Sequence, residues 1–178
     1  MGDALDPEDG WWEKIDVNDR ECWFYVMRHG ASIVTLVCED LARVDPVQTV
    51  IRSMGPNLVI ALLMDGPQLA RRWSARYATV LAEDPGSAVL TLTSVGMVRR
   101  SSMPGDNEPR EIALWKEPGG RTEELRLPAR AQALLVILAP AWEENFTLDG
   151  RSDTFGSMRL SLMGARGIYH PTPPRWAI

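Results

Sequence analysis

The amino-acid sequence predicts an α/β fold built on a parallel sheet, and three observations indicate it. Strand-like and helix-like segments alternate in the order β-α-β-α-β between residues 32 and 93. The strand-like run at residues 33–37 is almost continuously apolar, which suits a strand covered on both faces. The chain has 178 residues, of which 45% are hydrophobic and 24% charged, enough for one domain with a sizeable core.

The first elements read as a β-hairpin. Residues 22–27 and 32–37 are strand-like, and the four residues between them form a short loop that contains Gly30. Residues 1–20 look irregular and carry two large apolar side chains, Trp11 and Trp12, which must pack on something.

Two helices and two further strands complete the alternation. Asp45-Pro46 is a suitable helix start, and the apolar residues at positions 47–54 have helical spacing up to Gly55. Residues 57–63 are the next strand, and Asp65-Gly66-Pro67 ends it and opens a second helix, whose buried face is predicted to contain Leu69, Trp73, Tyr77, Val80 and Leu81. Asp84-Pro85-Gly86 stops that helix, and residues 87–93 form the third strand.

The pattern changes after Gly105. Residues 111–116 and 122–127 flank Pro118-Gly119-Gly120 and predict a second hairpin, which residues 132–138 follow as another apolar strand. Residues 141–178 show only weak periodicity, so we expect an extended C-terminal tail that wraps the surface or contacts a partner. The predicted division is an α/β domain over residues 1–140 and a tail over 141–178.

Charge and composition exclude several classes of function. A net charge of −5 without a long basic run argues against a nucleic-acid or anionic-membrane binder. No apolar run is long enough for a membrane helix and the acidic start does not resemble a signal peptide, so we expect a cytoplasmic location. The two cysteines are expected to be free. Without a CxxC or HExxH motif, and with two histidines, we assign no metal and no cofactor.

Cys38 is the candidate nucleophile because it ends an apolar strand shortly before a helix. In open α/β sheets this edge is where ligands bind, and the backbone N–H of Glu39 can point at a developing oxyanion. Two observations weigh against it: a free cysteine is usually a small buried hydrophobe, and neighbouring carboxylates by themselves raise the pKa of a thiol. A nucleophilic Cys38 therefore needs a base or positive charge from elsewhere.

The sequence offers few bases. His29 lies at the opposite end of the Cys38 strand, and His170 lies in a proline-rich tail where a surface position is favoured. Glu8 and Glu13, with Lys14, are upstream residues of suitable type, although composition alone favours a solvated charge at each position.

Several segments in order resemble the carbon–nitrogen hydrolase (nitrilase) superfamily. Val37-Cys38-Glu39-Asp40 is similar to the segment around the family's nucleophile, and Asn57-Leu58-Val59-Ile60 to the strand that follows it. The similarity continues through the helix with Arg72-Trp73 and Arg76, the strand 88–93, the hairpin around Pro118-Gly119-Gly120 and the strand 133–139. It covers residues 20–140.

This resemblance implies a fold and an activity. The fold is a nitrilase-like α-β-β-α sandwich, of which the chain holds a part, the C-terminal half. The activity is hydrolysis of a non-peptide C–N bond in a small amide or nitrile through a thioester on Cys38. Glu39 supplies its backbone N–H, and Glu8 or Glu13 is the family's second glutamate.

The general-base glutamate and the oxyanion lysine of the family precede this segment and lie outside the chain. The resemblance therefore implies a homo-oligomer or a complementing chain, and this chain alone is expected to be inactive. An alternative is a non-catalytic nitrilase-like module retained for binding or assembly. A third is an unrelated α/β binding protein in which Cys38 is buried.

Overall fold

Six strands form a mixed sheet at the centre of the structure. The structure is a computed structural model that describes residues 21–102, 109–143 and 156–171. The strands lie side by side in chain order, and β2, β3 and β4 are parallel while the others are antiparallel to their neighbours. Both expected hairpins and the parallel β-α-β-α-β unit are confirmed. The six strands are β1 (Phe24–Val26), β2 (Ser32–Val37), β3 (Leu58–Leu62), β4 (Ala88–Leu92), β5 (Glu111–Lys116) and β6 (Thr122–Arg126).

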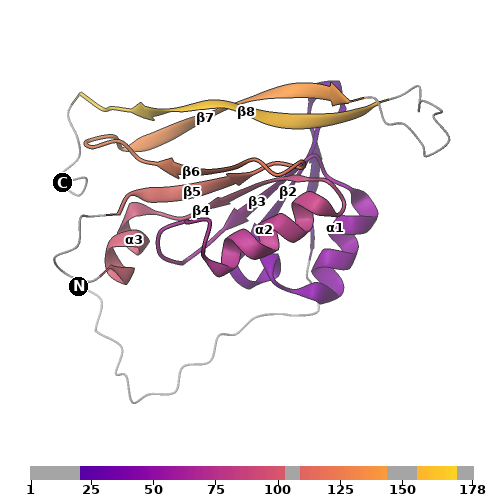
Figure 1. Cartoon of the computed structure of the whole chain (residues 1–178), viewed down its shortest axis with the longest axis horizontal. Helices are drawn as coiled ribbons and strands as arrows, with labels where there is room; N and C mark the ends of the chain where they lie inside the picture. The colour runs from indigo at the N-terminus through magenta and orange to yellow at the C-terminus, as the bar shows by residue number, and fades with distance from the viewer. Residues whose placement is uncertain (1–20, 103–108, 144–155, 172–178) are drawn as a thin grey trace, which may run out of the picture.

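Three helices cover one face of this sheet (Figure 1): α1 (Thr49–Met54), α2 (Trp73–Glu83) and α3 (Val95–Ser101). A 3₁₀ turn (Cys38–Leu41) and a π-helical turn (Val44–Gln48) precede α1. As expected, α1 ends at Gly55, whose φ of 55° is the left-handed conformation that glycine adopts freely. The expected start is confirmed in part: Asp45 has the extended backbone angles of an N-cap residue, and Pro46 follows in the π-helical turn that runs into α1, although no side chain caps α1.

The second helix begins later than predicted, and the third was not predicted. α2 starts at Trp73, so Leu69 lies in the preceding loop instead of on the buried face of the helix. The buried side chains of α2 include Ala75, Ala78 and Leu81. α3 is one short helix whose N-terminus is capped by Ser94, which accepts a hydrogen bond from the backbone N–H of Met97.

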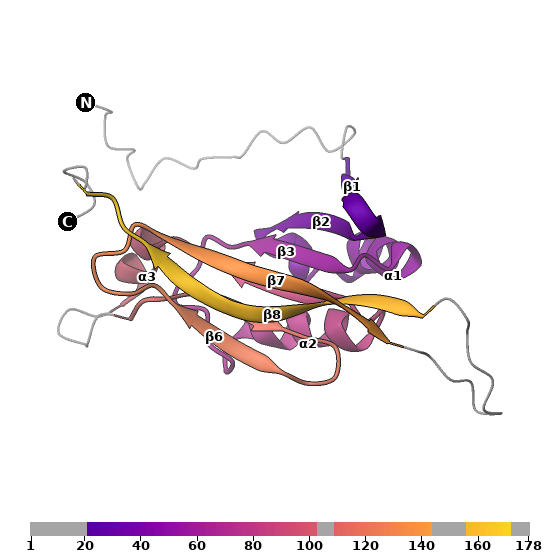
Figure 2. The ribbon, with the colours of Figure 1, turned by 90° about the horizontal axis from the view of Figure 1, so that it is seen from above.

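A long two-stranded ribbon, β7 (Ala133–Glu143) and β8 (Ser157–Ile168), lies over the other face of the sheet (Figure 2). The tail expected over residues 141–178 is therefore wrong for residues 157–168, which are a strand paired with β7 along its whole length. A bulge between Ile137 and Leu138 leaves Met163 unpaired on β8. Asn57 ties the ribbon to the sheet, because its Nδ2 donates to the carbonyl oxygen of Met158 at 2.6 Å.

The sheet separates two hydrophobic cores. The helix-side core includes Val34, Leu36, Leu41, Ile51, Val59, Ala61, Ala78, Leu81 and Val89. The ribbon-side core includes Leu58, Leu90, Trp115, Leu125, Leu160 and Leu162. The architecture is thus mixed α/β, with helices, sheet and ribbon stacked in that order (Figure 1). No helix of the described residues is long and apolar enough to span a membrane.

Candidate active site

Cys38 lies at the carboxyl edge of the parallel strands. β2 and β3 are in register with Val37 opposite Leu62, and the chain leaves β2 directly into the turn that begins at Cys38. Asp65 follows the neighbouring strand three residues after Leu62, so it belongs to the same edge. In parallel α/β sheets, this edge is where ligands bind.

The backbone of Cys38 adopts an unusual conformation. Its φ is 49°, in the left-handed region that costs a residue with a Cβ atom about 1–2 kcal/mol. Two neighbours hold this turn: the carboxylate of Asp40 accepts a hydrogen bond from the N–H of Val37 at 3.3 Å, and Leu41 is buried in the helix-side core. The side chain of Cys38 is half-buried. Left-handed residues of this kind concentrate at functional sites.

Glu39 directs its carboxylate to the surface. The side chain is 86% exposed, and its Oε2 lies 3.9 Å from Nη2 of Arg43. Such an exposed pair contributes little to stability. The role expected of the backbone N–H of Glu39 at an oxyanion stays a prediction.

The second thiol, Cys22, is largely exposed. Partial burial raises the pKa of Cys22, and the negative charge of Asp40 adds to this effect. Asp40 is also the residue that holds the turn at Cys38. Alkylation of Cys22 therefore has to be distinguished from that of Cys38 in any experiment on this edge.

The other predicted site residues belong to the N-terminal segment of the sequence. Glu8 and Glu13 lie outside the described residues, as does Lys14. Lys116, the lysine within the described residues, is buried at the end of β5 that pairs with Val89, and its Nζ donates to the carbonyl oxygen of Gly120 and to Thr122 Oγ1. This is the opposite end of the sheet from Cys38.

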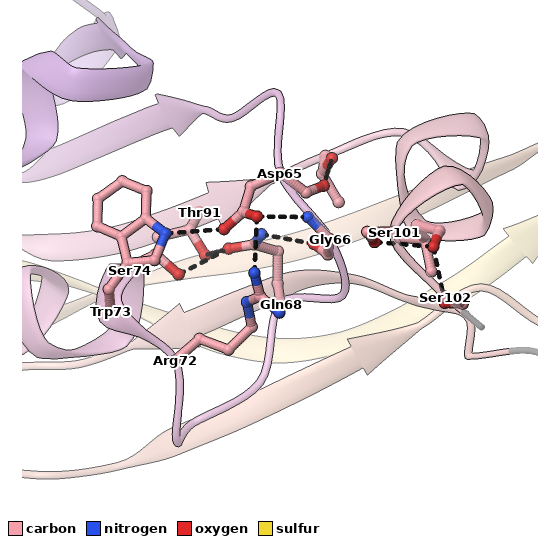
Figure 3. Close-up of polar contacts among 11 residues, drawn as sticks. Asp65, Gly66, Gln68, Arg72, Trp73, Ser74, Thr91, Ser101 and Ser102 are labelled. Carbon is pink, nitrogen blue, oxygen red and sulfur yellow. Dashed lines mark hydrogen bonds and ion pairs between the residues drawn. The ribbon is translucent and has the colours of Figure 1, made fainter. Parts of the chain in front are cut away.

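Sequence reasoning missed a polar cluster in the loop between β3 and α2 (Figure 3). The carboxylate of Asp65 accepts hydrogen bonds from the N–H of Gly66 at 2.7 Å, from Nη2 of Arg72 at 2.6 Å and from Nε1 of Trp73 at 2.8 Å. Burial opposes the ionised form, but these bonds and the charge of Arg72 outweigh it and hold the pKa of Asp65 below its usual range.

Gln68 lies beneath this loop and is fully buried. Its Oε1 accepts hydrogen bonds from the hydroxyls of Ser74 at 3.0 Å and Thr91 at 2.9 Å, and its Nε2 donates to the carbonyl oxygen of Gly66 at 3.0 Å. Every polar atom of the amide group is thereby engaged. Gln68 joins the loop to both α2 and β4.

Gly66 also brings the loop against the C-terminal end of α3. A Cβ atom at position 66 would lie 2.5 Å from Oγ of Ser101 (Figure 3). The loop after β3 is therefore held on both sides. The signal in the sequence is the presence of Asp65, Gln68 and Arg72 within eight residues, where the pattern predicted a strand stop, a helix start and a family-like helix with Arg72.

A shallow depression lies elsewhere, between the turn after β5 and the far end of the ribbon. Glu117, Glu143 and Arg159 are among its lining residues. Arg159 bonds both oxygens of Glu143, and Glu117 accepts from Trp115 Nε1 and from the N–H of Leu162. Arg159 and Glu143 therefore neutralise each other, and Glu117 already accepts two hydrogen bonds. Within the described ranges, no three His, Cys, Asp or Glu side chains are grouped to hold a metal ion.

Neither a protein-family model nor a curated protein matches the chain.

Proposed function

We propose that the chain carries the nucleophile of a thiol-dependent hydrolase that cleaves a non-peptide C–N bond in a small amide or nitrile. The observation that carries the proposal is Cys38 itself, held in a left-handed conformation at the carboxyl edge of a parallel sheet. The resemblance around Val37-Cys38-Glu39-Asp40 supports the reaction class.

In the proposed reaction the thiolate of Cys38 attacks the substrate carbon. With an amide, ammonia leaves with a proton from a general acid, and a thioester remains on sulfur. Water then attacks the thioester, which releases a carboxylic acid and returns the thiol. The N–H of Glu39 donates to the oxyanion in both steps.

The proton-transferring glutamate and the oxyanion lysine come from outside this chain. Lys116 supports this, because it lies at the other end of the sheet and donates to neighbouring groups. A homo-oligomer or a complementing chain would supply them, and the location would be cytoplasmic.

A second candidate is a non-catalytic nitrilase-like module for binding or assembly. The same position of Lys116, together with the surface orientation of Glu39, favours it for the chain by itself. Under this candidate Cys38 keeps its position but has no base.

Alkylation separates these candidates. Iodoacetamide is titrated across pH on the folded chain and each labelled cysteine is mapped by mass spectrometry, with Cys22→Ala as the matched control for Cys38→Ala. A nucleophilic Cys38 reacts faster than Cys22 near neutral pH, and Cys38→Ala abolishes any amide hydrolysis. Hydrolysis that survives Cys38→Ala refutes the hydrolase proposal. An unreactive Cys38 counts against a nucleophile in this chain by itself and favours the non-catalytic candidate.

A further inference from the structure

The pairing of the described strands leaves four open edges, and three of them are blunted. Open edges tend to pair with other chains unless the strand is short, charged or bulged. β1 has three residues, β6 carries Glu123, Glu124 and Arg126, and β8 carries two arginines and the bulge at Met163. These edges have the features that prevent pairing.

The edge of β7 is different. Residues 133–139 read Ala-Leu-Leu-Val-Ile-Leu-Ala, without a charge, proline or glycine. Leu134, Val136 and Leu138 pack against the ribbon-side core, whereas Leu135 and Ile137 are 37% and 44% exposed on the outer face. Before Pro140, β7 therefore lacks the charged and proline residues that protect an open edge, and an apolar edge of this kind tends to pair with another chain.

Among the residues that the structure describes, none covers an apolar corner of the sheet near this edge. Val37 and Leu62 are partners in the β2–β3 register and are 59% and 40% exposed. By alternation with the buried Leu36 and Ala61, both lie on the ribbon side of the sheet. Seen from above, the first part of β7 is on the side of the ribbon toward β2, and β2 lies beyond the ribbon (Figure 2). The free edge of β7 and this corner form a step.

We propose that this step binds an extended, uncharged segment of a partner polypeptide, which pairs with β7 as a third strand of the ribbon. One row of its side chains would cover Val37 and Leu62, and the other would extend the outer face of Leu135 and Ile137. Both environments are apolar, so the partner segment is apolar on both faces.

A second copy of this chain fits the step poorly. Paired strands lie about 4.8 Å apart. In each copy the sheet extends beyond β7 on its open side (Figure 2), so two β7 edges at that distance would bring the β2 strands of both copies into the same space. A segment without a sheet of its own beneath it does not meet this obstacle.

This inference adds a partner-binding surface to the proposed function. The identity of the partner rests on that proposed function. Val37 immediately precedes Cys38, so a third strand over Val37 runs beside the candidate active site. The complementing chain that supplies the missing catalytic groups would enter at this step. The surface itself follows from the edge and the corner alone.

The test uses a synthetic peptide with residues 133–139 between two terminal lysines as a stand-in for the partner strand. Hydrogen exchange followed by mass spectrometry should show exchange at residues 133–139 slowing about tenfold at saturating peptide. The same peptide with proline at its centre should have no effect. The double variant Val37→Lys/Leu62→Lys should raise the peptide Kd about tenfold or more, whereas Met54→Lys, an exposed position on α1, should leave it unchanged.

Three results overturn the inference. The first is unchanged hydrogen exchange at residues 133–139 with peptide, and the second is equal peptide affinity in the Val37/Leu62 variant. The third is exchange at residues 133–139 that slows with protein concentration alone, which would assign the edge to a second copy. Circular dichroism checks that both variants fold, as their exposed positions predict. The readout involves no hydrolysis. Hydrolysis that survives Cys38→Ala, together with a bound peptide, refutes only the hydrolase, and a reactive Cys38 without peptide binding refutes only the step.

Discussion

Replacing Gln68 with methionine should destabilise the protein strongly, although the volume of the side chain hardly changes. The substitution leaves three buried groups without a partner: the hydroxyls of Ser74 and Thr91 and the carbonyl of Gly66. Each unsatisfied group costs about 1–3 kcal/mol. Because hydroxyls can rotate to other acceptors, we expect the lower end, about 3 kcal/mol in total.

Urea unfolding followed by tryptophan fluorescence measures this loss. With a slope of about 2 kcal/mol/M for a chain of this size, the unfolding midpoint should fall by about 1.5 M. The matched control is Gln132→Met. Gln132 also makes two side-chain hydrogen bonds, to Arg130 and His170, but at the surface where water can replace them. Its loss should stay at about 1 kcal/mol or less.

Two results would refute the reasoning about Gln68. One is a loss below about 1 kcal/mol with an unchanged slope. The other is additivity of Gln68→Met with Thr91→Val, because two groups that share a hydrogen bond should show a coupling energy of about 1 kcal/mol.

Two further changes test the same loop. The pKa of Asp65 is lower in the folded state than in the unfolded chain, so its contribution to stability is present above the unfolded pKa of about 3.9 and disappears as the pH falls through the lower folded value. Urea unfolding at a series of pH values should therefore show a steeper loss below about pH 4 for the wild type than for Asp65→Asn, and parallel curves would count against it. Gly66→Ala places a Cβ atom 2.5 Å from Oγ of Ser101. In the wild type this hydroxyl donates a hydrogen bond to the carbonyl of Val98. Thermal unfolding should show a loss of about 1–2 kcal/mol that Ser101→Gly largely restores; no restoration would mean that the strain lies elsewhere.

Local patterns predicted most of the fold because most of its elements depend on local chemistry. The apolar runs at β2, β3 and β4 and the glycine at position 55 carry their own structural signals. β8 does not, because the bulge at Met163 shifts the alternation in the middle of the strand and Gly164 follows it at once. α2 began later than predicted because Gln68 is fixed by partners on α2 and β4.

The features of the candidate site were likewise predicted from the sequence only where they depend on local chemistry. Cys38 was predicted from its place after a strand, and its left-handed backbone was not, since that depends on Leu41 in the core and on the Asp40 bond. The hydrogen bonds of Gln68 beneath the Asp65 loop were missed because they are set by tertiary packing, such as the bond from the Thr91 hydroxyl, which lies 23 residues from Gln68 in the chain. A single sequence does not reveal such pairs.

The two cores differ in how far apart in the chain their members lie. The helix-side core is complete by Val89, whereas the ribbon-side core joins Leu58 to Leu160 and Leu162, and the Asn57–Met158 bond spans 101 residues. Contacts of long sequence separation form slowly, because a large loop must close before they are made. During synthesis, the helix-side core can therefore assemble while the ribbon is still to be made. Until β8 emerges, the ribbon side of the sheet, including Trp115, is uncovered, and this interval is when we expect the nascent chain to be most prone to aggregation.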